Sequence, residues 1–329
     1  MKNITFKAFM ASTITLSLIS TKVYSSGPID GDIYGRLNVS YQYENNEITG
    51  KAWKLANNAS RLGFKGKTSL KNNISILYQI EYGVEVDDGE KNGQTVSQRD
   101  TFIGLEGQWG QIKAGRITIP FKEAKGNIDR FNDLQGELGK IVDGEERINN
   151  IVQYSSQKLL GPVVATIAIV PGENSQNSNE NGPADGISGS FVFNNDKLYL
   201  GLAFNSNIKE QDQWRLATSW QWGDSDNGLI SLGALYQHSE TSSNSQLTYI
   251  DGRNEADAYG ISSSYTLQSN TFKAQYIISD RSVSLSDARQ FSFAIEHKLG
   301  ERSTLFAYYA DRDAAEATQS NSYLAIGLK

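Results

Sequence analysis

The feature that most constrains this chain is a strict alternation of apolar and polar residues over segments of about a dozen positions. The apolar or small residues of the first such segment are Ile33, Gly35, Leu37, Val39, Tyr41 and Tyr43. The residues between them are Tyr34, Arg36, Asn38, Ser40, Gln42 and Glu44. A period of two is typical of a β-strand with one apolar and one polar face, and this run is roughly twice the usual globular strand of about 5–6 residues.

The alternation recurs along the chain at a length that suits a membrane crossing. Between residues 214 and 222, one face carries Trp214, Leu216, Trp220 and Trp222, and the other carries Arg215, Ser219 and Gln221. Eight steps of roughly 3.3 Å, tilted by about 40°, raise the chain about 20 Å. The tryptophans would then lie near the rims of an apolar band about 25 Å tall, where aromatic girdles occur.

The pattern predicts sixteen strands joined by connections of alternating length. The predicted strands begin near Ile29, Asn58, Ile74, Ser97, Gly110, Ile148, Val163, Ile187, Leu198, Trp214, Leu229, Ala256, Thr271, Arg289, Ser303 and Gln319. Tight turns at 71–73, 194–197, 268–270 and 300–302 separate longer polar loops such as 45–57, 87–96, 171–186 and 239–255. Short turns on one side and long loops on the other are typical of outer-membrane barrels. We therefore predict an all-β, 16-stranded antiparallel transmembrane β-barrel.

The N-terminus has the pattern of a secretory signal peptide. Lys2 and Lys7 precede a modest apolar run from residue 9 to residue 19, and small or tolerated residues follow at 23–25. The run is too short to span a bilayer. We predict a signal peptide at residues 1–25 and a single barrel domain at residues 26–329.

Composition argues against several classes of function. Loss of residues 1–25 removes three lysines and no acids, so the net charge falls from −6 to −9, which disfavours nucleic-acid binding. The chain has no cysteine and only two histidines, His238 and His297, neither within a serine motif. The acidic Asp30 and Asp32 lack the full spacing of a calcium loop. We expect no catalytic residue, no metal site and no cofactor.

One connection departs from the pattern. Between Arg116 and Arg147 about thirty residues rich in Gly, Asp, Glu and Lys show no sustained alternation. Connections of this length are usually functional or disordered. A wide barrel offers a further arrangement, in which the loop folds into the lumen and narrows it.

Several motifs resemble those of the general porins of Gram-negative bacteria. They are the opening strand 32–36 (DIYGR), the segment 61–66 (RLGFKG), Gly104-Leu105 after Arg99, Gly115-Arg116 and the run 129–136. The most specific of them is RLGFKG, and its position on the second predicted strand strengthens the match. The resemblance extends over essentially the whole chain after residue 25.

The resemblance implies a third loop that folds inward and presents carboxylates opposite a wall of basic side chains. Transferred position by position, the predicted pore constriction consists of Arg36, Arg61, Arg99, Arg147, Asp129 and Asp133. Alternation independently places Arg36 and Arg61 on the polar face of their strands. Opposed charges across a narrow pore create a transverse field that orients solutes and sets a weak ion preference. A solvated arginine wall and a solvated acidic loop remain the alternative interpretation.

The sequence also differs from the family pattern. Arg130 adds a positive charge beside Asp129, and the loop tip reads NDLQG at residues 132–136. The sequence ends IGLK at residues 326–329, where similar porins continue to a terminal aromatic. We expect a short aromatic extension to raise the yield of assembled protein.

The function that this resemblance implies is passive diffusion of small hydrophilic solutes and ions. The expected partners are two further copies in a homotrimer, outer-membrane lipids and lipopolysaccharide. A solute-selective channel is one alternative, and an adhesin or phage receptor acting through its loops is another. An enzyme acting through His238 or His297 is the third alternative.

Overall fold

The computed structural model describes residues 31–90, 93–158, 161–173, 181–242, 255–282, 287–314 and 320–329. Its strands are β1 (Gly31–Arg36), β2 (Val39–Asn46), β3 (Gly50–Asn57), β4 (Arg61–Ser69), β5 (Ser75–Val84), β6 (Val96–Gly107), β7 (Gly110–Thr118), β8 (Arg147–Ser155), β9 (Val163–Val170), β10 (Gly186–Asn194), β11 (Leu198–Ile208), β12 (Gln211–Asp224), β13 (Gly228–Thr241), β14 (Glu255–Leu267), β15 (Asn270–Arg281), β16 (Ala288–Lys298), β17 (Thr304–Ala314) and β18 (Asn321–Leu328). Two short helices, α1 (Pro120–Glu123) and the 3₁₀ helix η1 (Leu138–Lys140), lie between β7 and β8. The predicted signal peptide lies outside the described residues.

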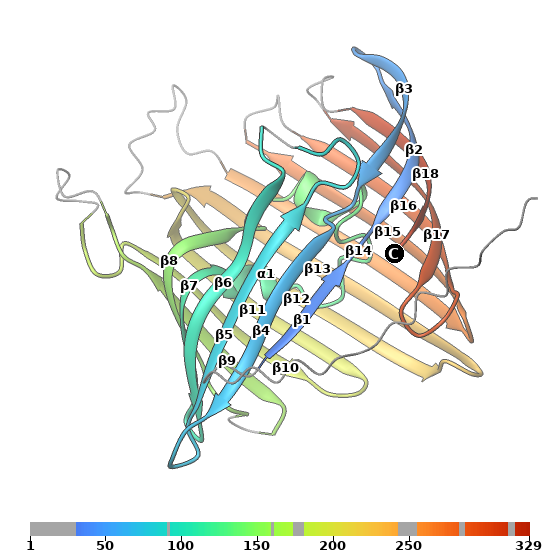
Figure 1. Cartoon of the computed structure of the whole chain (residues 1–329). Helices are drawn as coiled ribbons and strands as arrows, with labels where there is room; N and C mark the ends of the chain where they lie inside the picture. Colours follow the sequence, from blue (N-terminus) through green and yellow to red (C-terminus); the bar gives the residue numbers. More distant parts are fainter. Residues whose placement is uncertain are drawn as a thin grey trace, which may run out of the picture.

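All eighteen strands belong to one antiparallel sheet that curves around the two short helices (Figure 1). From β4 to β18 each strand pairs with its neighbour in sequence. β18 pairs in turn with β2, from Asn321 opposite Asn46 to Leu328 opposite Val39. β2 pairs with β3, and β1 pairs with β4. The all-β antiparallel architecture is therefore confirmed.

The structure has eighteen strands rather than sixteen, because the first predicted strand is interrupted and one further strand lies in a predicted loop. Leu37 and Asn38 separate β1 from β2, and residues 58–60 separate β3 from β4. At the second break Ala59 has a positive φ of 55°. The backbone N–H of Asn38 donates to the Ser60 hydroxyl at 2.9 Å in place of a regular ladder bond. The chain bends where a side chain takes over a backbone partner.

The predicted loop at 45–57 is wrong, because most of it is strand. β2 continues to Asn46 and a turn leads directly into β3, which extends beyond the other strands in Figure 1. Trp53 stacks on Tyr41 at 5.0 Å between ring centroids and lies equally close to Tyr43. Cross-strand aromatic pairs of this kind stabilise hairpins. The residues of β3 do not alternate regularly between apolar and polar, so the alternation of the sequence did not predict this strand.

The two faces of the sheet follow the predicted alternation. Ile33 is 79% exposed and Leu37 is 68% exposed, whereas Gln42 on the opposite face is fully buried. The same division holds on β12, where Trp214, Leu216, Trp220 and Trp222 are all exposed and Arg215 is buried. The apolar side chains therefore point away from the inner side of the curved sheet, and the polar ones point toward it. Neither short helix in the described ranges is long enough to cross a membrane.

The exposed apolar face predicts a facing-dependent response to charge. Leu216 lies near the middle of β12 and is 43% exposed, and Gln221 lies on the opposite face of the same strand. We expect Leu216→Arg to destabilise the protein folded in lipid vesicles by about 2–4 kcal/mol, because its charge would lie in hydrocarbon. Gln221→Arg is the matched control and should have little effect. Denaturant titration in vesicles measures both, and equal losses would contradict the outward assignment of Leu216.

Candidate functional site

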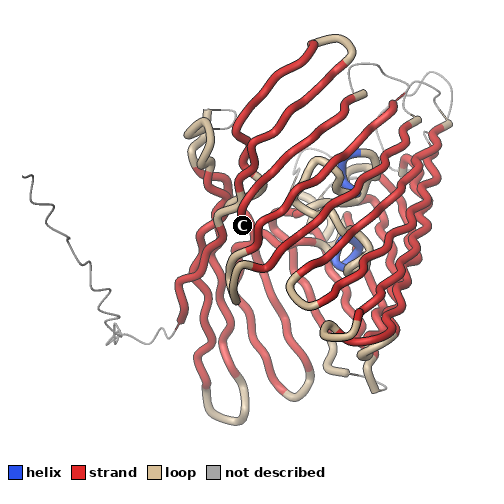
Figure 2. The backbone as a smooth tube through the Cα atoms, turned by 90° about the vertical axis from the view of Figure 1, so that its right-hand side faces the viewer, coloured by secondary structure: helices blue, strands red, loops and turns tan. Residues whose placement is uncertain are grey.

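The segment between β7 and β8, residues 119–146, packs against the polar face of the sheet. Figure 2 shows both of its short helices inside the curve of the strands. Its apolar side chains are buried rather than exposed to solvent, and they are Ile119, Phe121, Ala124, Ile128, Phe131, Leu134, Leu138, Ile141 and Val142. We call residues 119–146 the inner loop.

The first turn of the inner loop is fastened to β10 and β11. Pro120 begins α1, where its missing N–H costs nothing. The backbone N–H of Phe121 donates to the Ser188 hydroxyl at 3.2 Å. The Tyr199 hydroxyl donates to the carbonyl oxygen of Ala124 at 2.9 Å. Strands distant from β7 in sequence therefore hold the loop.

Arg215 of β12 joins the two ends of the inner loop. Its guanidinium is fully buried and forms an ion pair with Glu145 at 2.8 Å, near the end of the loop. It also donates to the carbonyl oxygen of Phe121 at 3.3 Å and lies 4.4 Å from the centroid of that ring. Two further bonds, at 2.8 and 2.6 Å, go to the Gln237 side-chain oxygen. Because Arg215 is saturated with partners, its buried charge is compensated.

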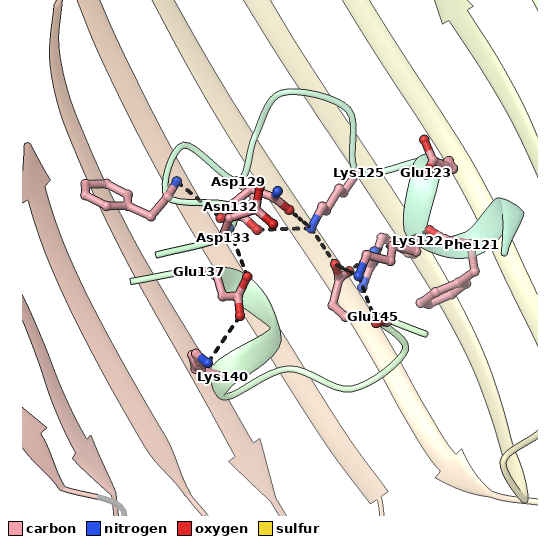
Figure 3. Close-up of polar contacts among 12 residues, drawn as sticks. Phe121, Lys122, Glu123, Lys125, Asp129, Asn132, Asp133, Glu137, Lys140 and Glu145 are labelled. Carbon is pink, nitrogen blue, oxygen red and sulfur yellow. Dashed lines mark hydrogen bonds and ion pairs between the residues drawn. The ribbon is translucent and has the colours of Figure 1, made fainter. Parts of the chain in front are cut away.

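Lys125 continues this network along the loop (Figure 3). Its ammonium forms an ion pair with Glu145 and a second with Asp129 at 3.0 Å, and it donates to Asn132 at 3.3 Å. Burial alone would lower the pKa of Lys125, but the charges of Glu145 and Asp129 outweigh it and raise the pKa. Burial likewise would raise the pKa of Glu145, yet Arg215 and Lys125 lower it. Lys125 and Glu145 are therefore both charged at neutral pH.

The middle of the loop is held by β15, β16 and β17. The Gln275 side chain accepts from the backbone N–H of Arg130 at 2.7 Å and donates to the carbonyl oxygen of Gly136 at 3.2 Å. Gln290 donates to the carbonyl oxygen of Glu137 at 3.1 Å, and Arg312 donates to that of Gln135 at 2.9 Å. Two side-chain amides and one guanidinium thus satisfy loop backbone groups that would otherwise lack partners.

Three of the six predicted residues meet directly. Asp133 at the loop tip forms an ion pair with Arg36 of β1 and lies 3.8 Å from Arg61 of β4. Burial would raise the pKa of Asp133, but the hydrogen bond from Arg36 and the charges of both arginines outweigh it and lower the pKa. The carboxylate therefore stays charged at neutral and mildly acidic pH. This contact is lost only as pH falls through that lowered pKa.

The other two predicted arginines pair with carboxylates of the strands rather than of the loop. Arg99 contacts Glu81 at 2.5 Å, and Arg147 contacts Asp100 at 2.7 Å. Both arginines line the same cavity as Arg61, which has a volume of about 880 Å³. Glu81 and Asp100 were not predicted, although each occupies the polar parity of an alternating strand.

Asp129 forms its ion pair with Lys125 and not with any of the four predicted arginines. Its side chain is 1% exposed and faces Lys125 and Gln275. The residues that sequence reasoning missed are those that hold the loop, above all Arg215, Glu145 and Lys125. For Arg215 a signal existed, since it is the charged residue on the polar face of the tryptophan-rich strand.

A second cavity of about 260 Å³ lies against the inner loop, and it shares five lining residues with the first. The shared residues are Arg61, Asp129, Asn132, Asp133 and Leu134. The larger cavity is also lined by Asn57, Glu85 and Gln94, toward the long connections. The smaller one reaches Lys273, Glu296 and Lys329, near the short turns. The two cavities therefore meet where Asp133 faces Arg36 and Arg61.

Neither histidine lies at this site. Nδ1 of His238 is 3.0 Å from an oxygen of Asp257, and Nδ1 of His297 is 2.9 Å from the side-chain oxygen of Asn270. Within the described ranges no cluster of three or more acidic or histidine side chains has an arrangement that could hold a metal ion.

Comparisons with known proteins agree with this architecture. A family model described as "Gram-negative porin" matches residues 24–316. The major outer membrane protein P.IB of Neisseria sicca is 28% identical over 157 residues, which is 45% of this chain and 43% of that protein. The chain thus matches less than half the length of this relative.

Solved porin structures share the fold over almost the whole chain. The anion-selective porin from Comamonas acidovorans has a TM-score of 0.72 at 18% identity, covering 91% of this chain and 98% of that one. The trimer form of OmpT from Vibrio cholerae has a TM-score of 0.61 at 12% identity, covering 92% and 99%.

The anchoring role of Arg215 predicts that its loss releases the inner loop. The chain has no cysteine, so Val142→Cys, a buried position beside Asp143, provides a unique reporter. Breaking a buried ion pair costs about 3–5 kcal/mol, and adding Arg215→Leu should raise maleimide labelling of the reporter by roughly tenfold or more. The control is Lys67→Leu, which removes the exposed pair of Lys67 with Glu106. Unchanged labelling after Arg215→Leu would show that other contacts hold the loop.

Proposed function

The chain belongs to the Gram-negative porin family, and we propose from this premise that it is an outer-membrane channel for passive diffusion of small hydrophilic solutes and ions. The observation that carries the proposal is the pair of water-accessible cavities on the polar face, which meet at Asp133, Arg61 and their neighbours. A polar path with an apolar exterior is what a membrane channel requires. The family is one of channels rather than enzymes.

We propose that the eighteen strands form a sixteen-stranded barrel. β1 and β2 are two parts of one bent strand, and so are β3 and β4, because only two or three residues separate the parts. The pairing of β1 with β4 and of β2 with β3 supports this interpretation. The pairing of β18 with β2 then joins the last strand to the first. A barrel without free edges suits a bilayer, where unpaired backbone groups are costly.

The boundary between the two cavities is the proposed constriction. Asp133 supplies its negative charge, and Arg36 and Arg61 supply positive charges from the facing strands. Arg99 and Arg147 extend the basic wall into the larger cavity, where Glu81 and Asp100 partly neutralise them. Asp129 acts within the loop network rather than across the pore. The resulting field would orient dipolar solutes as they pass.

Ion selectivity tests the constriction. We expect Asp133→Asn to move the reversal potential in a potassium chloride gradient toward anions, because it removes the acid opposite Arg36 and Arg61 across less than a Debye length of about 8–10 Å. Asp129→Asn is the matched control and should have a much smaller effect, since its carboxylate is buried against Lys125. Replacing Arg61 and Arg99 by Gln should move the potential toward cations. Equal shifts from the two aspartate variants would contradict this placement.

Planar-bilayer recording also separates the alternative functions. A general diffusion channel conducts potassium chloride without a saturable substrate. A solute-selective channel would show block by its solute. A barrel that acts mainly as an adhesin or phage receptor, plugged by its inner loop, would conduct poorly.

We further propose that three copies associate, together with outer-membrane lipids and lipopolysaccharide. The fold is shared with a porin solved in a trimer form, and the outward face of each copy carries large exposed apolar residues such as Ile33 and Ile261. A continuous strand network resists detergent, so unheated protein should migrate as a folded trimer on electrophoresis and boiled protein as an unfolded monomer. Crosslinking counts the subunits. Identical mobility with a strictly monomeric crosslinking product would rule out this assembly.

A further inference from the structure

Cationic side chains outnumber acidic ones in the lining of the smaller cavity, five to three. Its charged lining residues are Arg36, Arg61, Arg130, Lys273, Lys329, Asp129, Asp133 and Glu296. The cavity lies on the short-turn side of the inner loop, because Lys273 follows the turn after β14 and Lys329 follows β18. A solute crossing the constriction from the larger cavity would enter this one next.

The carboxylates of this cavity do not balance its cations. Glu296 is shared between Lys273 and Lys329, each at 2.7 Å. Asp133 is likewise shared between Arg36 and Arg61. Asp129 is paired with Lys125, which does not line this cavity. Each pair of cations therefore retains a net positive charge, and Arg130 adds to it.

Arg130 is the cation with the least compensation. Among the residues that the structure describes, no carboxylate lies within ion-pair distance of it. One terminal nitrogen donates to the Ser231 hydroxyl, and its Nε has no acceptor. Its backbone is held by Gln275, so the side chain starts from a fixed position. An uncompensated guanidinium beside a polar cavity favours an anion, since its planar fork matches oxyanions.

The larger cavity has a different balance. Its arginines and lysines are accompanied by at least as many acids, and the acids are Glu81, Glu85, Asp100, Glu123, Asp129, Asp133 and Glu137. The sign of the lining therefore changes along the path, from mixed on the long-loop side to positive on the short-turn side. Because of this difference, the smaller cavity favours anions more strongly than the larger cavity does.

We propose that the smaller cavity is a weak binding site for compact oxyanions of the phosphate class, held by Arg130 together with Arg36, Arg61 and Lys273. The inference rests on the proposed channel function, since the anion reaches the cavity along the pore. A cavity of about 260 Å³ has room for a compact anion together with several water molecules. The anion would thus keep part of its hydration shell and leave readily, as permeation requires.

Two measurements with inorganic phosphate test the site. Phosphorus NMR line broadening reports binding to the detergent-solubilised trimer, independently of conduction. Planar-bilayer recording reports the reduction of potassium chloride current when phosphate is added.

Arg130→Gln should weaken both effects by roughly tenfold, the equivalent of one charge-assisted hydrogen bond. Arg130→Lys should restore part of the binding. Lys67→Gln, which removes an equal charge from a residue lining neither cavity, should leave both effects unchanged.

The outcomes distinguish the inference from the proposed function. Conduction by the wild type without phosphate broadening would overturn the site and leave the channel intact. Phosphate broadening that Arg130→Gln abolishes, in a protein that does not conduct, would overturn the channel and support the site. Equal weakening by Arg130→Gln and Lys67→Gln would show that only the overall charge matters, and would overturn the site.

Discussion

The buried ion pair between Arg215 and Glu145 is the contact on which the inner loop depends. Arg215 belongs to the wall of the sheet, and its guanidinium contacts both ends of the loop, at Phe121 and Glu145. A buried guanidinium is stable only when its charge is paired and its N–H groups have acceptors. Glu145 provides the opposite charge, and the side-chain oxygen of Gln237 accepts two further hydrogen bonds. Without this contact the two ends of the loop would lose their shared anchor on β12, and only the hydrogen bonds to the other strands would hold the loop and place Asp133 beside Arg36.

The loop in turn contributes to the lining of two cavities with different electrostatics. On the side of the long connections, the lining of the larger cavity contains both cations and acids. On the short-turn side, shared carboxylates leave a cationic excess, and Arg130 has no counterion among the described residues. The same loop therefore both narrows the path and changes the sign of its lining. In the proposed channel, such a change of charge would affect how long different solutes stay in each cavity.

Much of the fold could be predicted because a strand with one lipid-facing side must alternate. Strand starts such as Gly110, Val163 and Leu198 coincide with the predicted positions. The hairpin of β2 and β3 was missed because its stability comes from Trp53 stacking on Tyr41, a cross-strand contact that no periodicity reveals. The breaks before β2 and β4 were not predicted for a similar reason. The Ser60 hydroxyl accepts a hydrogen bond from the backbone N–H of Asn38, and this contact between two segments does not appear in the local pattern of the sequence.

The sequence by itself determined the all-β class, which face of each strand is apolar, and that Arg36 and Arg61 lie on the polar face. These features are local, because successive side chains of a strand necessarily point to opposite sides. Only the tertiary structure decided that Asp133 meets those arginines while Asp129 turns to Lys125, and that Arg215 holds the loop. Charged residues that are far apart in sequence form ion pairs only where the folded backbone brings them together. A loop without periodicity has no local pattern from which its path could be predicted.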